Sequence, residues 1–216
     1  MLFRDRAEAG AFLARELLDA LPSLRSEAVT VLAIPRGGVA VAAPIAALLQ
    51  APLDVFVARK LGAPNQEELG IGAVAADGTR VLDDTLVRVL RVSDSYIEKV
   101  TKRELAEAKR RLALFRGARA PAPVRERSVI LVDDGLATGG TARAALAVLR
   151  AEQPARLIFA APVASMDGAE SLTALGVATV FSAIPKHFHG VGEWYEEFEQ
   201  VSDEAVLALL AEAAAR

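Results

Sequence analysis

Short apolar runs alternate along the chain with longer segments in which apolar residues recur every three or four positions. The runs are rich in β-branched residues and predict strands buried on both faces, whereas the longer spacing predicts helices packed by one face. Strands are expected at residues 29–34, 53–58, 129–132, 156–163 and 178–183. Helices are expected at residues 7–21, 39–50, 141–149 and 167–175, with a last helix capped by Ser202. This alternation predicts an α/β fold with a mainly parallel sheet flanked by helices.

The middle of the chain has a different pattern. Residues 70–75 and 79–82 flank Asp77-Gly78, a dipeptide typical of hairpin turns. A long polar helix follows from about Ser93 to Phe115, where Ser95 and Glu98 have the spacing of a capping box. Its apolar residues form one stripe, and its charged residues four positions apart are most simply interpreted as a solvated face.

Composition restricts the possible classes of function. The apolar stretch 39–58 approaches membrane-spanning length, but Pro44, Pro52 and Asp54 interrupt it, which favours a buried helix followed by a buried strand. A formal charge of −3 argues against a general nucleic-acid binder. The chain has no cysteine, so disulfides and thiolate chemistry are excluded, and a reducing, cytoplasmic location fits. The charged N-terminal segment does not have the apolar core of a signal peptide.

The segment from Val129 to Thr141 carries the clearest chemical signal. A buried strand ends at two carboxylates, Asp133 and Asp134, and a turn rich in Gly and Thr leads into a helix. Unpaired N–H groups at a helix start form an anion site suited to a phosphate, and ionised carboxylates suit sugar hydroxyls and Mg²⁺. The pattern therefore predicts a cradle for a phosphorylated sugar. A surface turn is the simpler alternative, and the absence of Gly-Lys-Ser/Thr argues against a P-loop ATPase.

This segment resembles the signature of type I phosphoribosyltransferases that binds 5-phosphoribosyl 1-diphosphate (PRPP). The resemblance implies a five-stranded, mainly parallel core with a hood built from the chain ends. It implies that Asp133 and Asp134 contact the ribose hydroxyls, with Mg²⁺ nearby as the cofactor. It also implies that the 5′-phosphate is held by Ala137, Thr138, Gly139, Gly140 and Thr141.

Two further segments are similar to the family's layout. Arg36, Gly37 and Gly38 follow the first strand, where the family keeps a pyrophosphate loop with a non-proline cis peptide, so a strained or cis bond is expected between Pro35 and Arg36. Arg59 and Lys60 end the second predicted strand and look like catalytic pyrophosphate contacts, followed by a mobile loop at residues 61–68. An ordinary βα turn and a basic pair at a sheet edge are the respective alternatives.

The acceptor is less well defined. Many 6-oxopurine enzymes of the family have Asp where this chain has Ala137, which argues against a hypoxanthine or guanine acceptor. The tail resembles that of bacterial family members with an unsettled acceptor, and Phe188, Trp194 and Tyr195 are candidates for stacking on a base. Packing of the hood is the alternative for these rings. A metal pair at His187 and His189 has little support.

Together these patterns predict one phosphoribosyltransferase domain over residues 1–216. Residues 62–117 form an inserted loop, hairpin and long helix, and residues 185–216 join the N-terminal helix as the hood. The expected reaction transfers a phosphoribosyl group to a nitrogen nucleophile, with a nucleobase of nucleotide metabolism as the expected acceptor. A PRPP-sensing regulator without turnover and a structural relic are the alternatives. The expected partners are PRPP and a small-molecule acceptor, without nucleic acid or membrane, and a homodimer is the candidate assembly.

Overall fold

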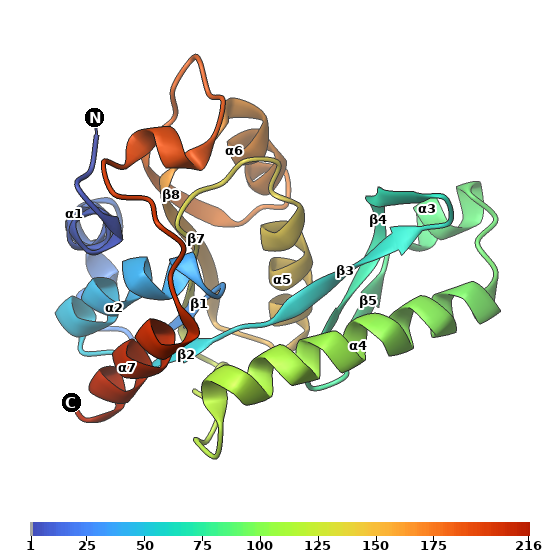
Figure 1. Cartoon of the computed structure of the whole chain (residues 1–216), viewed down its shortest axis with the longest axis horizontal. Coiled ribbons are helices and arrows are strands. Elements are labelled where there is room, and N and C mark those ends of the chain that lie inside the picture. Colours follow the sequence, from blue (N-terminus) through green and yellow to red (C-terminus); the bar gives the residue numbers. More distant parts are fainter. Residues whose placement is uncertain (1) are drawn as a thin grey trace.

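The computed structural model describes residues 2–216, apart from the side chain of Glu68. The described chain contains two sheets (Figure 1). The central sheet is parallel throughout, in the order β2-β1-β6-β7-β8. Its strands are β1 (Val29–Ala33), β2 (Leu53–Val55), β6 (Ser128–Val132), β7 (Arg156–Val163) and β8 (Ala178–Ala183). The predicted five-stranded parallel core is confirmed.

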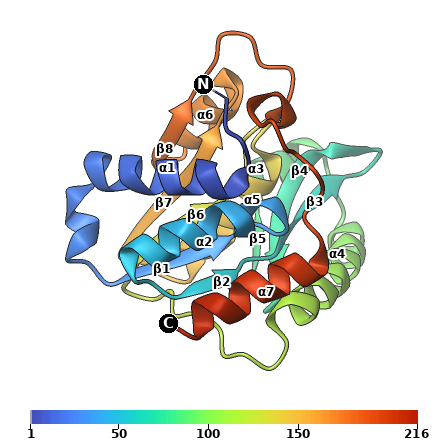
Figure 2. The same ribbon diagram turned by 60° about the vertical axis from the view of Figure 1, so that its left-hand side comes forward.

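Helices cover both faces of the central sheet (Figure 2). One face carries α1 (Arg6–Ala20), α2 (Gly37–Leu49) and α7 (Asp203–Ala214). The other face carries α5 (Gly140–Ala151) and α6 (Met166–Thr173). Short 3-10 turns, η1 (Pro22–Arg25) and η2 (Val191–Trp194), complete the core and the hood. No helix in residues 2–216 is both long and apolar enough to span a membrane.

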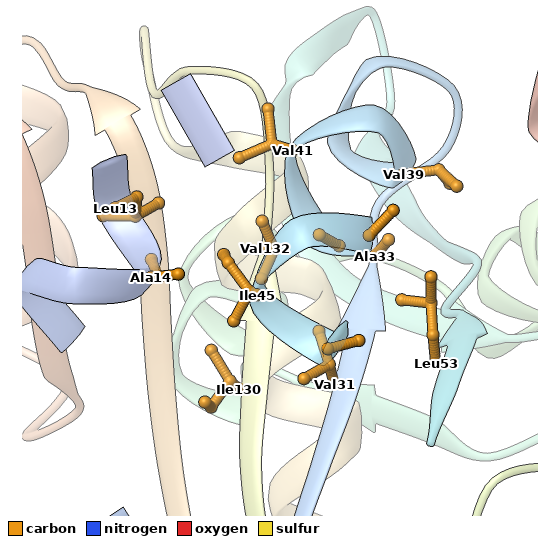
Figure 3. Close-up of a cluster of buried hydrophobic side chains, with 14 of the residues drawn as sticks. Leu13, Ala14, Val31, Ala33, Val39, Val41, Ile45, Leu53, Ile130 and Val132 are labelled. Atoms are coloured by element: carbon orange, nitrogen blue, oxygen red, sulfur yellow. The ribbon is translucent and has the colours of Figure 1, made fainter. Parts of the chain in front are cut away.

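Strand β6 shows how one sequence fills both layers. Alternate side chains of a strand point to opposite faces. Ile130 and Val132 pack with α1 and α2, as Figure 3 shows, while Val129 and Leu131 pack with α5 and α6. All of β6 is buried, which is why the sequence is an unbroken apolar run rather than an alternating one.

The insertion forms a second layer beside the core. Strands β3 (Ala58–Ala63), β4 (Gln66–Ala75) and β5 (Arg80–Leu82) make an antiparallel sheet, followed by α3 (Asp84–Val89) and α4 (Asp94–Arg116). The hairpin at Asp77-Gly78 and the long helix are confirmed, whereas α3 was not predicted. The predicted N-cap of α4 was also wrong. Ser93, rather than Ser95, accepts a hydrogen bond from the Tyr96 backbone N–H at 3.3 Å.

The second predicted strand is divided between the two sheets, which corrects the prediction. Strand β2 ends at Val55, and Arg59 and Lys60 lie in β3, paired with Val74 and Ala73 of β4. Residues 61–68, predicted as a mobile loop, instead form the end of β3, the turn after it and the start of β4. Asn65 adopts a left-handed φ of 60° after Pro64, which makes a tight turn between paired strands.

A buried ion pair fixes the insertion to the core. Asp54, only 4% exposed, accepts from Arg116 at the end of α4 with an N–O distance of 2.7 Å. The same carboxylate accepts from the backbone N–H of Val55 at 2.8 Å and of Ala122 at 3.1 Å. The carboxylate therefore joins β2, α4 and the segment that returns to β6.

We predict that Asp54→Ala lowers the free energy of unfolding by about 3 kcal/mol, because Arg116 loses its buried counter-charge and two N–H groups lose their acceptor. Thermal and urea unfolding followed by circular dichroism measure this loss. Asp19→Ala, the same change at an exposed position of α1, is the matched control and should stay within about 0.5 kcal/mol of the wild type. Equal losses in the two variants would contradict the role assigned to Asp54.

Candidate functional site

A cavity of about 460 Å³ lies at the carboxyl edge of the central sheet. It brings together three segments that are far apart in the sequence: the turn after β1, the start of β3, and the turn after β6. Its polar lining includes Arg36, Arg59, Lys60, Asp133, Asp134 and Thr141. The residues predicted to bind ribose and pyrophosphate therefore line one space, with the exception of Gly38.

The two turns at this edge approach each other so closely that glycine is required. A β-carbon added to Gly37 would lie 1.8 Å from the Asp134 Oδ2 atom, and one added to Gly38 would lie 2.7 Å from the Val132 carbonyl oxygen. Both glycines belong to the first turn of α2 rather than to a separate turn. The Pro35–Arg36 peptide is cis, as predicted.

The two carboxylates leave β6 in different environments. The Asp133 N–H donates to the Ala160 carbonyl at 3.2 Å, and the Asp133 Oδ1 atom accepts from the Asp134 N–H at 2.9 Å. Burial, reinforced by the neighbouring charge of Asp134, raises the pKa of Asp133 well above its ordinary value. Asp133 is therefore costly to keep ionised unless a cation or hydroxyl groups compensate it.

Asp134 is held by both ends of the chain. Its Oδ2 atom accepts from the Arg6 Nε–H at 2.8 Å, in a pair whose side chains are 10% and 19% exposed. Its carbonyl accepts from the Tyr195 hydroxyl at 2.6 Å. Arg6 also donates to the Glu199 carbonyl at 2.8 Å and lies over the Phe198 ring at 4.0 Å. The sequence offered no signal for Arg6 beyond a basic residue at a helix start.

The Gly/Thr-rich turn is hydrogen-bonded to the end of β7 and the residues after it, and the N–H groups at the start of α5 have no side-chain cap. The Leu136 N–H donates to Val163 at 2.9 Å, and the Ser165 hydroxyl donates to the Ala137 carbonyl at 2.6 Å. Gly139 caps α5 in a left-handed conformation, and no side chain caps that helix start. Its first N–H groups thus remain available to a ligand.

The predicted phosphate residues do not all line the cavity. Thr141 lines it together with the acid pair, whereas Gly140 lines a separate 580 Å³ groove between α5 and the second sheet. Ala137 and Thr138 are exposed, and Gly139 is buried. The cup predicted at residues 137–141 therefore lies at the margin of the cavity, and Thr141 is its residue that lines the cavity.

Helix α4 forms a charged wall of the cavity that the sequence interpretation treated as solvated. Glu104 is 7% exposed, and its two oxygens accept from the Nε–H groups of Arg59 and Arg103, each at 2.9 Å. Arg111 also lines the cavity. A signal was present: Ile97, Val100, Glu104, Ala108 and Phe115 are the buried positions of α4, so Glu104 interrupts an apolar stripe.

The aromatic rings of the tail do not line the cavity. Tyr195 is 5% exposed, packs with Phe3, and stacks on Phe198 with ring centroids 5.0 Å apart. Trp194 joins the same cluster, and Phe188 is partly exposed. None of the three predicted acceptor residues lines the cavity. For Tyr195 the structure favours the packing alternative, because burial leaves its ring unable to stack on a base.

Asp133 and Asp134 are two neighbouring carboxylates of the cavity that could contact a metal ion. Within residues 2–216, no group of three or more His, Asp or Glu side chains is placed to hold a metal. Asp133 and Asp134 nevertheless supply hard oxygen donors at one wall of the cavity, which is the donor type that Mg²⁺ prefers.

Comparison with known proteins gives consistent matches. Residues 4–196 match the family model described as "Phosphoribosyl transferase domain". A crystal structure of the protein TT1426 from Thermus thermophilus is similar with a TM-score of 0.91 and 42% identity, covering 98% of this chain and 99% of that one. Two strains of Mycobacterium tuberculosis carry a protein named "putative phosphoribosyl transferase" that is 43% identical over 209 residues.

The match to the Mycobacterium proteins covers nearly all of this chain but less than half of each relative. It covers 97% of this chain but 46% of each relative. The chain thus spans about half the length of the curated relatives it matches.

We predict that Asp133→Asn stabilises the free protein at pH 7 by a few degrees, with roughly 1 kcal/mol corresponding to 2–4 °C at this chain length. Because the folded-state pKa of Asp133 is raised, the folded protein binds its proton more tightly than the unfolded chain does. Wild-type stability therefore falls as the pH rises from the ordinary aspartate range through the raised pKa. The variant does not bear this cost.

Melting temperatures of both proteins between about pH 3 and pH 7 provide the measurement. The advantage of the variant should shrink as the pH falls below the ordinary aspartate pKa, where wild-type Asp133 is protonated in both the folded and the unfolded state. A variant that is less stable than the wild type at pH 7, or an advantage that is the same at every pH, would contradict the burial cost assigned to Asp133.

Proposed function

Because this chain belongs to the phosphoribosyl transferase domain family, we propose that it transfers a 5-phosphoribosyl group from PRPP to a nitrogen nucleophile, with nucleobases as the first acceptors to test. In this reaction the bond from ribose C1 to the pyrophosphate oxygen breaks and a bond from C1 to nitrogen forms. The nitrogen loses a proton, and pyrophosphate leaves. The observation that carries the proposal is the convergence of Asp133, Asp134, Arg36 and Arg59 on one cavity.

The acid pair would bind and orient the ribose. Ionised carboxylates accept hydrogen bonds from hydroxyl groups, and sugar hydroxyls would replace the water that burial removes from Asp133. Positive charge develops on the ribose ring as the leaving group departs, and fixed negative charge nearby stabilises it. Arg6 keeps Asp134 in place, so the pair does not reorganise during the reaction.

The basic residues would bind the leaving pyrophosphate. Arg36 comes from the turn after β1, and Arg59 and Lys60 come from β3, so cations reach the cavity from two elements. Glu104 holds Arg59 at 2.9 Å, which fixes the direction of its guanidinium. Mg²⁺, when bound with PRPP on the side of the two aspartates, would supply further neutralisation of the pyrophosphate charge.

The start of α5 would bind the 5′-phosphate. Gly140, Thr141 and Ala142 have N–H groups without partners inside the helix, and the helix dipole favours an anion there. Thr141 lines the cavity, and its hydroxyl would add a donor. This arrangement leaves the acids for the sugar and the helix start for the phosphate.

We predict that the double variant Asp133→Asn/Asp134→Asn weakens PRPP binding in the presence of Mg²⁺ by about 2 kcal/mol or more, because neutral amides lose charge-assisted bonds. Isothermal titration calorimetry measures the binding, and pyrophosphate release with a panel of nucleobases measures turnover. The double variant Asp83→Asn/Asp84→Asn is the matched control: it also neutralises two adjacent acids, and neither lines this cavity.

The outcomes separate the possible functions. PRPP binding with pyrophosphate release supports the transferase. PRPP binding without turnover on any acceptor would support a PRPP-sensing regulator. Undetectable PRPP binding by the wild-type protein, or unchanged binding by the Asp133/Asp134 double variant, would overturn the assignment of the site.

We also predict that Thr141→Val weakens the binding of ribose 5-phosphate by about 1 kcal/mol, the usual contribution of one hydroxyl hydrogen bond. The substitution keeps the side-chain shape, so the melting temperature should remain close to that of the wild type. Calorimetric titration compares the two proteins, and Thr85→Val on the exposed face of α3 is the control. Equal affinities in wild type and Thr141→Val would show that this hydroxyl does not contact the phosphate.

A further inference from the structure

A second basic cavity lies on the other side of Arg36. It has a volume of about 450 Å³ and lies where α4 passes the start of α7, an arrangement visible in both ribbon views (Figures 1 and 2). Its polar lining consists of Arg6, Arg36, Arg110, Arg111, Gln200 and Asp203. We call this space the α4–α7 cavity.

The α4–α7 cavity is continuous with the main cavity but is not the same site. The two share the residues Pro35 to Gly37 and Arg111. Arg110, Gln200 and Asp203 line the α4–α7 cavity alone, whereas the two acids of the strand end, Asp133 and Asp134, line only the main cavity. A ligand in the second space would therefore contact residues that the proposed reaction does not use.

The guanidinium groups of the α4–α7 cavity have donors to spare. A guanidinium has five N–H donors in a fork that fits phosphate oxygens. Arg111 donates one hydrogen bond, from Nε to the Glu107 carboxylate at 2.8 Å. Arg110 donates two hydrogen bonds to the same carboxylate, from Nε and from one terminal nitrogen. Hydrogen bonds from Arg110 and Arg111 lower the pKa of Glu107 to about 2, so one ionised carboxylate is shared by two cations.

Arg36 is held only loosely inside the α4–α7 cavity. Its NH1 atom lies 3.4 Å from the Asp203 Oδ1 atom, whereas charge-assisted N–H···O bonds are usually about 2.7–2.9 Å long. Both side chains of this pair are about one-third exposed, at 33% and 39%. Such a pair is weak, and an anion with several oxygens would compete effectively for the guanidinium.

We propose that the α4–α7 cavity is a second anion site that binds a phosphoryl group, with Arg110 and Arg111 as ligands and Arg36 shared with the main cavity. The carboxylate of Asp203 occupies this position when no anion is present. Two sources could provide the phosphoryl group: the departing pyrophosphate of the proposed reaction, or a separate phosphorylated small molecule. The site itself does not depend on turnover.

The test is calorimetric titration of inorganic pyrophosphate with Mg²⁺ into the whole chain. We expect two pyrophosphates per chain for the wild type. Arg110→Gln should weaken the second binding event roughly tenfold, as expected for the loss of one charge-assisted contact, and leave the first event unchanged. Asp203→Asn should have the opposite effect and tighten the second event, because it removes the competing carboxylate.

Lys109→Gln is the matched control, since it removes the same charge from an adjacent, exposed position of α4 that lines neither cavity. It should bind pyrophosphate as the wild type does. One pyrophosphate per chain, or equal binding by Arg110→Gln and Lys109→Gln, would overturn the proposal. A general effect of net charge would instead make Lys109→Gln weaken binding as much as Arg110→Gln does, because both substitutions remove one positive charge.

A second titration, into protein saturated with PRPP and Mg²⁺, distinguishes the two sources. If pyrophosphate still binds to the α4–α7 cavity of the PRPP-saturated protein, the occupant is a separate phosphorylated molecule. PRPP then fills the main cavity while pyrophosphate fills the second one. Loss of the second binding event in the PRPP-saturated protein identifies the departing product as the occupant, because the second space is then open to an anion only after PRPP has reacted. Two pyrophosphate sites in a protein that does not bind PRPP would contradict the proposed function and uphold the second site.

Discussion

Two adjacent carboxylates stand at the end of a strand that is buried along its whole length, and the surrounding structure compensates their charge. Asp134 is paired with Arg6, and Asp133 accepts the Asp134 N–H. The compensation of Asp133 is incomplete, since burial still raises its pKa. This residual cost is the physical reason to expect a ligand: hydroxyl groups and a cation would supply what the folded chain does not.

This requirement explains why both chain ends fold over the same edge of the sheet. Arg6 enters from the first helix, and the tail contributes the Tyr195 hydroxyl and the Glu199 carbonyl that hold Asp134 and Arg6. The aromatic rings of the tail thereby act as support for an ion pair. The close approach of Gly37 to Asp134 adds a steric limit, so the acid can occupy only a narrow range of positions.

Helix α4 gives the site its second wall and its excess of cations. Its buried acid, Glu104, directs Arg59 into the main cavity, while Arg111 lies between the main cavity and the α4–α7 cavity. The Asp54–Arg116 pair fixes the far end of this helix to β2. The insertion is thus a structural part of both cavities, and we infer that its long charged face serves binding as well as solvation.

The sequence by itself determined the elements whose cause is local. Apolar runs marked the five strands of the central sheet, although β2 is shorter than its run and β8 is mostly half-buried. The strand, acid pair and glycine turn of residues 129–141 indicated the chemistry, because strand burial and helix-start donors depend on neighbouring residues. Only the tertiary structure decided which distant groups meet. Arg6 and Asp134 are 128 positions apart, the pairing of β3 with β4 moved Arg59 into a second sheet, and burial of Tyr195 removed it from the acceptor candidates. Ion pairs and close packing depend on positions in space that the spacing of residues along one chain does not encode.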